Sequence, residues 1–329
     1  MRVLFGRGKV SADLSFDALA PLLPGWELAT CPPEQVIDHL DGVDVICPLG
    51  ARIDARVIAA GRFGLVHQFG VGLDGVDIDA ATRHGVWAAR VPGDASGNAD
   101  SCAELAVLLL LALARQLDQS RAVLAERRWP DRPVGRSLLD ATVLIVGLGA
   151  IGTAVARRLG PFGPRLLGVR ARPQAGGPGE LALVAGADRL HELLGEADAV
   201  VCCAMLHNGN AGLFGPAEFA AMKPGVLFVN VARGGLVDEQ ALLAALESGR
   251  VGGAGLDVFA REPADPRSPL VLHPRVIATP HIGWLTGHMF ARTNEVFAAN
   301  LQRFARGEQP LWTVNEPPFV RSSITAPGA

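Results

Sequence analysis

The 329-residue sequence contains no tyrosine and only two lysines, Lys9 and Lys223, among its thirty basic residues. Without tyrosine, no phenol can serve as a general acid, which excludes the Tyr–Lys pair of one large class of oxidoreductases. Two scattered lysines form no G-x-x-x-x-G-K-[ST] phosphate-binding motif and leave little basis for a Schiff-base enzyme. Any cationic chemistry therefore depends on arginine or histidine.

The charge, the cysteines and the apolar runs exclude further classes of protein. A net charge of −3 gives no basic surface for nucleic acid. The five cysteines are odd in number and form no C-x-x-C, which indicates buried thiols and no disulfide framework or metal site. The apolar stretch 103–114 is too short to span a membrane, and the run at the start is too short for a signal peptide. We expect a cytoplasmic protein without a metal, a nucleic-acid partner or a membrane.

The length and the pattern of apolar runs predict two α/β domains. Residues 140–289 contain mostly continuous apolar runs, which are typical of parallel strands covered on both faces. Gly, Pro, Asp and Asn over 92–98 predict a loop before the apolar helix. After Gly287, residues 290–304 have helical periodicity, and residues 310–314 could return as a strand to the first domain. The expected strands are 2–5, 43–47, 65–68, 86–89, 142–146, 165–169, 199–203, 226–231, 253–258 and 276–278.

A glycine motif follows one of these strands directly. The run 143–146 leads into Gly147-Leu148-Gly149-Ala150-Ile151-Gly152, and residues 153–159 continue as a helix. In a G-x-G-x-x-G fingerprint the first glycine permits a tight turn, the second admits a pyrophosphate and the third packs the helix against the strand. We therefore assign a dinucleotide site to Gly147, Gly149, Ala150, Ile151 and Gly152, with the pyrophosphate at the helix N-terminus.

The end of the next strand indicates which dinucleotide binds. An NAD site usually has Asp or Glu about twenty residues after the motif, where it accepts from the ribose 2′-hydroxyl. Here Arg170 takes that place and Arg172 follows. Two guanidiniums suit a 2′-phosphate, which they can bind bidentately. The sequence predicts NADP(H) in preference to NAD(H); the alternative is two solvated arginines in an arginine-rich chain.

Three later strands each lead to an ionisable residue: Arg233, Glu262 and His281. Because the carboxyl ends of parallel strands line one crevice, we expect these side chains to converge where a nicotinamide would lie. Arg233 can bind a substrate carboxylate and polarise a carbonyl. His281 can donate a proton to the carbonyl oxygen, and Glu262 can orient its ring and favour the imidazolium. Six further histidines lack such partners and are interpreted as surface or packing residues: His67, His84, His191, His207, His273 and His288.

Together these motifs resemble the D-isomer-specific 2-hydroxyacid dehydrogenase family over nearly the whole chain. The matching stretches are 70–77, 101–104, 147–152, 230–235, 255–259 with Glu262-Pro263, and 279–283. The resemblance implies two Rossmann-like domains with doubly wound parallel sheets and an active site in the cleft between them. We expect residues 1–100 and 290–329 to form a discontinuous substrate-binding domain, and residues 101–289 the dinucleotide-binding domain.

The resemblance also implies roles for further residues. The backbone amides of Val71 and Gly72 would hold the substrate carboxylate, and Asp257 would contact the nicotinamide carboxamide. Val231, at its strand end, is assigned to the cofactor site. Trp284 stands where small residues are common in the family and is either part of the substrate pocket or an aromatic packed in the core or at a dimer contact. The resemblance further implies a homodimer formed through the nucleotide domain.

Within the family, Arg170 and Arg172 are similar to the NADPH-preferring glyoxylate/hydroxypyruvate reductases, whereas Glu262 argues against the formate dehydrogenase branch, which has glutamine there. The first hypothesis is NADPH-dependent reduction of a small 2-oxo acid to the D-2-hydroxy acid, with His281 as proton donor. The alternatives are NAD-linked oxidation of a D-2-hydroxy acid and a nucleotide-sensing, co-repressor-like binding protein on the same fold.

Overall fold

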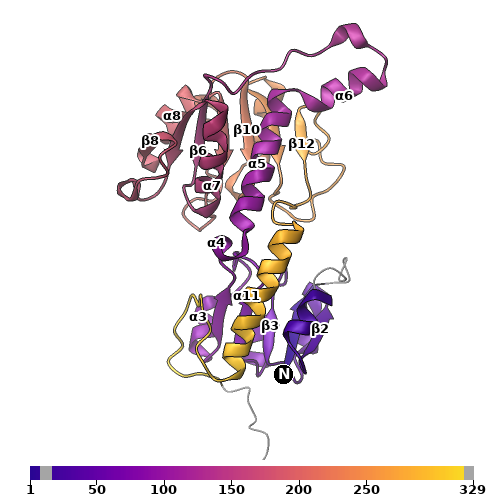
Figure 1. Ribbon diagram of the computed structural model, residues 1–329, viewed down its shortest axis with the longest axis vertical. Helices are drawn as coiled ribbons and strands as arrows, with labels where there is room; N and C mark the ends of the chain where they lie inside the picture. The colour runs from indigo at the N-terminus through magenta and orange to yellow at the C-terminus, as the bar shows by residue number, and fades with distance from the viewer. Residues whose placement is uncertain (8–16, 322–329) are drawn as a thin grey trace, which may run out of the picture. The chain divides into compact units, whose positions relative to one another are not determined.

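A computed structural model describes residues 1–7 and 17–321, and the chain divides into two compact units (Figure 1). Unit 1 comprises Met1–Asn98 and Thr286–Ala329, and unit 2 comprises Ala99–Leu285. Each unit contains one parallel sheet with helices on both faces, so the predicted α/β fold class is confirmed. Among the described residues, no helix combines the length and the apolar character needed to cross a membrane.

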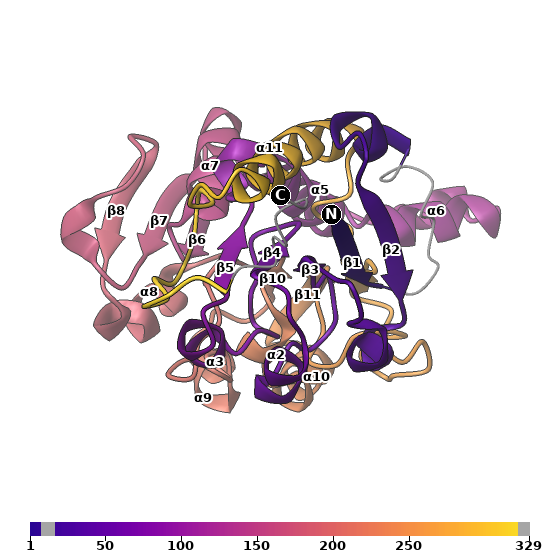
Figure 2. The ribbon, with the colours of Figure 1, turned by 90° about the horizontal axis from the view of Figure 1, so that it is seen from below.

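Unit 1 contains a five-stranded sheet in the order β2-β1-β3-β4-β5, so the order reverses between β1 and β3. Figure 2 shows α2 and α3 on one side of this sheet and α11 on the other. The strands are β1 (Arg2–Gly6), β2 (Glu27–Cys31), β3 (Val45–Cys47), β4 (Leu65–Gln68) and β5 (Trp87–Arg90). The helices are α2 (Ala55–Ala60), α3 (Ile78–Arg83), α4 (Gly93–Ser96) and α11 (Gly287–Ala305).

The alternation of side chains along β1 explains these layers. Val3 and Phe5 pack in one cluster with Phe297 of α11, while Leu4 packs in the other with Ile58 of α2. Successive strand residues point to opposite faces, so a continuous apolar run is stable only when helices cover both sides. One face of the unit 1 sheet is therefore covered only when α11 packs on it, although α11 lies far along the chain from these strands.

Unit 2 contains a seven-stranded sheet in the order β12-β11-β10-β9-β6-β7-β8. Helices α5 and α7 cover one face, and α8, α9 and α10 cover the other. The strands are β6 (Thr142–Val146), β7 (Arg165–Val169), β8 (Leu181–Ala185), β9 (Ala199–Cys202), β10 (Val226–Asn230), β11 (Val251–Leu256) and β12 (Val276–Ala278). The helices are α5 (Asn98–Ala114), α6 (Leu117–Ala125), α7 (Ala150–Leu159), α8 (Leu190–Glu196), α9 (Pro216–Ala221) and α10 (Glu239–Glu247).

The structure differs from the expected elements in several respects. The strands β2 and β8 were not predicted, because both lie at sheet edges and carry partly exposed, mixed side chains. The segment expected as a loop over 92–98 contains the short helix α4. The strand β11 begins and ends two residues earlier than expected, which places Val258 after the strand. Residues 310–314 return to unit 1 as expected, through an antiparallel bridge between Ala89 and Thr313, but they form an isolated bridge where a strand was expected.

The five cysteines are buried and lie outside disulfides, as predicted. One histidine, His67 of β4, is fully buried as well and packs edge-on against Phe297. Its Nδ1 donates to the carbonyl of Gln68 at 3.0 Å, and its Nε2 accepts from Nδ2 of Asn300 at 2.7 Å. Asn300 also bonds the backbone of Leu311 through both of its side-chain polar atoms. His67 therefore joins β4 to α11 only as a neutral ring.

Burial lowers the pKa of His67 to about 4, although its bond to the Gln68 carbonyl acts in the opposite direction. The pKa of His67 is lower in the folded chain than in the unfolded chain. At pH values between these two pKa values, the unfolded chain therefore binds more protons than the folded chain. Stability is then full above the unfolded pKa and falls as the pH drops toward 4.

We therefore predict that the free energy of unfolding of the wild type falls by about 2 kcal/mol more than that of His67→Gln between pH 7.5 and pH 5. Glutamine can make similar hydrogen bonds but does not titrate, so all other pH effects are shared. Urea unfolding at both pH values measures the difference. An equal loss in the two proteins would contradict this role for His67.

Candidate active site

The candidate site lies at the carboxyl edge of the unit 2 sheet. Strands β6 and β9 are neighbours there, and the chain order runs outward from them in opposite directions. In open parallel sheets ligands bind at such a switch point. The glycine motif follows β6, and Arg233, Glu262 and His281 follow β10, β11 and β12 at the same edge. The parallel direction of the strands thus brings both groups of predicted residues to one side of unit 2.

The glycine turn has the close contacts that its motif requires. Gly147 has φ +101°, and a Cβ there would overlap the backbone of Ala204. A Cβ at Gly152 would overlap the carbonyl of Gly147, so α7 packs directly on the turn. By contrast, a Cβ at Gly149 would meet nothing within 4 Å, and no side chain caps α7. The first amides of α7 therefore face open space at Gly149, which fits a bound pyrophosphate.

Arg170 directly follows β7, beside this turn. Its NH1 donates to the carbonyl of Gly176 at 2.5 Å, and its side chain is half-buried. Arg172 is exposed and begins the short turn over Pro173–Ala175. A guanidinium has five donors, so the bond to Gly176 orients Arg170 without using all of them.

His281 and Glu262 are in direct contact, as predicted. Nδ1 of His281 lies 2.7 Å from Oε2 of Glu262, and both side chains are a little more than one-third exposed. Oε1 of Glu262 accepts from the amide of Phe259 at 3.1 Å. Burial alone would raise the pKa of Glu262, but the bonds from His281 and Phe259 and the charge of Arg233 hold it below its usual range. Glu262 is therefore an anion that holds the imidazole by Nδ1.

Asp257 holds the turn on which His281 lies. This carboxylate is only 1% exposed and accepts from Oγ1 of Thr279 and from the amides of Ile282 and Gly283 at 2.6–2.9 Å. His281 has φ +55°, a left-handed conformation that few non-glycine residues adopt. The three bonds to Asp257 therefore stabilise the backbone conformation that presents the imidazole.

Arg233 is held by a second buried polar residue. Asn230, 1% exposed at the end of β10, donates to the carbonyl of Arg233 and accepts from the amide of Ala232, both at 3.0 Å. The Arg233 side chain donates to the carbonyl of Ala232 at 2.8 Å. Among the remaining predicted residues, Val231 is buried beside this turn, and Trp284 is half-buried after the His281 turn.

The predicted substrate residues Val71 and Gly72 belong to unit 1, where they follow β4. Gln68, the last residue of β4, clamps this loop: its Nε2 donates to the carbonyl of Gly72 at 2.7 Å, and its Oε1 accepts from the amide of Leu49 at 3.1 Å. Arg90 donates to the carbonyl of Val71. The loop is therefore fixed by its carbonyls.

Sequence reasoning did not assign Gln68, Asn230 and the turn-holding bonds of Asp257. The one sequence signal that these residues share is their position: each is a polar residue at or directly after the end of a buried strand. One expectation about the histidines needs correction, because His191 does have a partner: its Nε2 lies 2.9 Å from Oε1 of Glu218, and the histidine is exposed.

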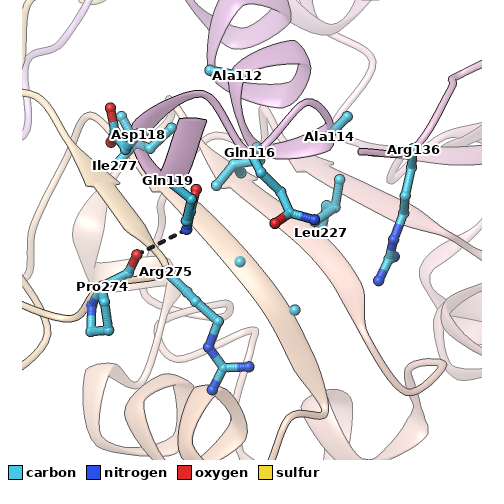
Figure 3. Close-up of a pocket in the computed structure, with 13 residues that line it drawn as sticks. Ala112, Ala114, Gln116, Asp118, Gln119, Arg136, Leu227, Pro274, Arg275 and Ile277 are labelled. Carbon is cyan, nitrogen blue, oxygen red and sulfur yellow. Dashed lines mark hydrogen bonds between the residues drawn. The ribbon is translucent and has the colours of Figure 1, made fainter. Parts of the chain in front are cut away.

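A hollow in unit 2 lies at the opposite edge of the sheet (Figure 3). It is lined by the end of α5, the start of α6 and the residues at the amino ends of β10, β11 and β12. Arg136 donates to the carbonyl of Gly225, Arg275 to that of Leu246, and Gln119 to that of Pro274. These side chains satisfy backbone carbonyls, so we assign them a structural role and place the chemistry at the carboxyl edge.

Comparison with known proteins agrees with this geometry. Residues 107–283 match the family model described as D-isomer specific 2-hydroxyacid dehydrogenase, NAD binding domain. A glyoxylate reductase of Thermococcus gammatolerans is 37% identical over 297 residues, which cover 87% of this chain and 86% of the relative. A D-3-phosphoglycerate dehydrogenase of Rattus norvegicus is 37% identical over 287 residues, which cover 86% of this chain. The chain spans about half the length of that dehydrogenase.

Solved structures give the same result for the fold. An NADPH-dependent glyoxylate/hydroxypyruvate reductase from Sinorhizobium meliloti, in complex with NADP and malonate, matches with a TM-score of 0.83 at 29% identity, covering 98% of this chain and 99% of that one. The family model covers more than half of the chain, and the glyoxylate reductase is matched over most of its own length. The chain therefore belongs to the D-isomer specific 2-hydroxyacid dehydrogenase family.

Proposed function

We propose that this protein is an NADPH-dependent reductase that converts a small 2-oxo acid, similar to glyoxylate or hydroxypyruvate, into a D-2-hydroxy acid. The observation that supports the proposal best is the contact between His281 and Glu262 on the sheet edge that also bears the glycine turn. This arrangement combines a proton donor, an anion that holds it and a dinucleotide-binding turn. The names of the glyoxylate reductase relative and of the reductase from Sinorhizobium meliloti support the choice of substrate.

The residues present fit a dinucleotide. The turn at Gly147 and the open space at Gly149 suit a pyrophosphate, and Arg170 with Arg172 suit a 2′-phosphate. In this proposal Ala150 and Ile151 supply helix N-terminal amides, and Val231 lines the cofactor site. Asp257 lies at the same sheet edge, and the family resemblance implies that it contacts the nicotinamide carboxamide in addition to holding the His281 turn. When bound, the reduced nicotinamide supplies a hydride to the carbonyl carbon.

The chain's own residues bind the substrate and supply its proton. Arg233 pairs with the substrate carboxylate and stabilises negative charge as it develops on the carbonyl oxygen. The family resemblance implies that the amides of Val71 and Gly72, in unit 1, would also bind the substrate carboxylate. Because Nδ1 of His281 faces Glu262, the proton that reaches the substrate is on Nε2. Glu262, an anion throughout the neutral range, stabilises the imidazolium that donates it. Trp284 follows the turn and would shape the pocket.

We predict that His281→Ala and Arg233→Ala each lower kcat/KM for 2-oxo acid reduction by about 10²–10⁴-fold. His273→Ala is the matched control, because His273 precedes β12 at its opposite end and should have little effect. The assay follows NADPH absorbance with a panel of 2-oxo acids. No turnover by the wild type despite intact NADPH binding would favour a nucleotide-sensing binding protein. If the wild type oxidises D-2-hydroxy acids with NAD faster than it reduces 2-oxo acids with NADPH, the result would favour a dehydrogenase that works in the oxidative direction.

Cofactor preference gives a separate prediction. Loss of a charge-assisted contact of about 1.5–3 kcal/mol in Arg170→Asp should lower the ratio of kcat/KM for NADPH over NADH by about 10- to 100-fold. Arg165→Asp, at the other end of β7, removes an exposed ion pair with Glu196 and should leave the ratio unchanged. Equal use of both cofactors by the wild type would contradict the proposed NADPH preference.

We also propose a homodimer formed through unit 2. The α5–α6 region and the segment after it carry several large, exposed apolar side chains, which a dimer contact there would cover. They are Leu108, Leu117, Leu124, Trp129 and Val134, at 47–87% exposure.

Light scattering should therefore give twice the chain mass of 34.4 kDa for the wild type. The double variant Leu124→Asp/Trp129→Asp should shift to the monomer, because burying two carboxylates opposes association. Leu311→Asp, an exposed apolar position in unit 1, is the control and should stay dimeric. A monomeric wild type would overturn the proposal.

A further inference from the structure

One peptide bond in unit 2 is in contact with two other parts of the chain. It joins Phe259 to Ala260 in the loop between β11 and Glu262. A Cβ at Gly234, directly after Arg233, would overlap this peptide, so the Arg233 turn packs against it with no side chain between them. On the same peptide, the amide of Ala260 donates to Oε1 of Glu239 at 2.7 Å. The loop that leads to Glu262 is thus held between the Arg233 turn and the start of α10.

Glu239 is not needed to cap α10. The N-cap is Asp238, whose Oδ1 already accepts from the amides of Gln240 and Ala241 at 3.0 and 3.1 Å. Glu239 is half-buried and uses its carboxylate on a loop 21 residues away. Holding the long Glu239 side chain in one rotamer costs conformational entropy, and this cost is not offset by a cap on α10. The contact therefore fixes the loop.

The position of this loop determines the position of Glu262. The amide of Phe259 donates to Oε1 of Glu262, and the amide of the next residue, Ala260, donates to Glu239. Oε2 of Glu262 in turn holds Nδ1 of His281. Two consecutive backbone amides are thus held by two carboxylates, of which one faces the proposed proton donor.

We propose that Glu239 is a positioning residue for the reaction: it fixes the 259–262 loop so that Glu262 holds His281 in register with Arg233. The proposal rests on the proposed function for its kinetic consequence. Because Gly234 allows no side chain between the two turns, loosening the loop moves Glu262 relative to both partners. Misplacement of catalytic groups by fractions of an ångström to one ångström is known to be costly.

The test compares Glu239→Ala, which removes the acceptor, with Glu239→Gln, which keeps an acceptor oxygen. Glu247→Ala removes an exposed carboxylate from the other end of α10 and is the control. Two readouts are recorded: kcat and KM for 2-oxo acid reduction, and the NMR resonance of the Nδ1 proton of His281, identified by its loss in His281→Ala. NADPH affinity confirms that each variant is folded.

We expect Glu239→Ala to lower kcat by about 10- to 100-fold with little change in KM for NADPH, and to shift or broaden the His281 resonance. Glu239→Gln should restore both. Wild-type values in Glu239→Ala would overturn the proposal, and so would equal impairment of the alanine and glutamine variants. If the wild type reduces no 2-oxo acid, the proposed function fails, while the resonance still decides whether Glu239 positions His281.

Discussion

The parallel direction of the seven strands in unit 2 is the constraint on which the candidate site depends. A parallel sheet brings every strand's carboxyl end to one edge, so residues as distant in sequence as Gly147 and His281 emerge on the same side. The sheet fixes where each turn begins but not where its side chain points. Backbone-to-carboxylate bonds fix that direction, and the bonds from the amides of Ile282 and Gly283 to Asp257 are the clearest example.

Buried polar groups connect the stability of unit 2 to the geometry of its site. Asp257 and Asn230 are almost fully buried, and a buried carboxylate or amide without partners would be costly. Both residues find their partners in the backbone of the turns that bear His281 and Arg233. The core of the unit therefore favours the same turn conformations that the proposed chemistry would require, which is preorganisation of the candidate site.

The sequence predicted those parts of the structure that depend on local patterns. Continuous apolar runs identified the central strands, because burial on both faces requires apolar residues in sequence. The glycine motif identified the turn after β6, because close backbone contacts there require glycine. The edge strands β2 and β8 escaped detection because one exposed side relaxes the apolar requirement. The Asp257–Gly283 and His67–Asn300 bonds span 26 and 233 residues, and no local spacing encodes them.

The division of unit 1 into two segments has a consequence for synthesis on the ribosome. Unit 2 is inserted between these segments, so its chain is complete before α11 is made. Until α11 emerges, the face of the first sheet formed by Val3, Phe5 and Val45 lacks its cover. A nascent chain therefore exposes an apolar sheet face throughout the translation of unit 2, the kind of surface that chaperones bind and that promotes aggregation. Folding of the amino-terminal unit is thus the last step, although its first strand is made first.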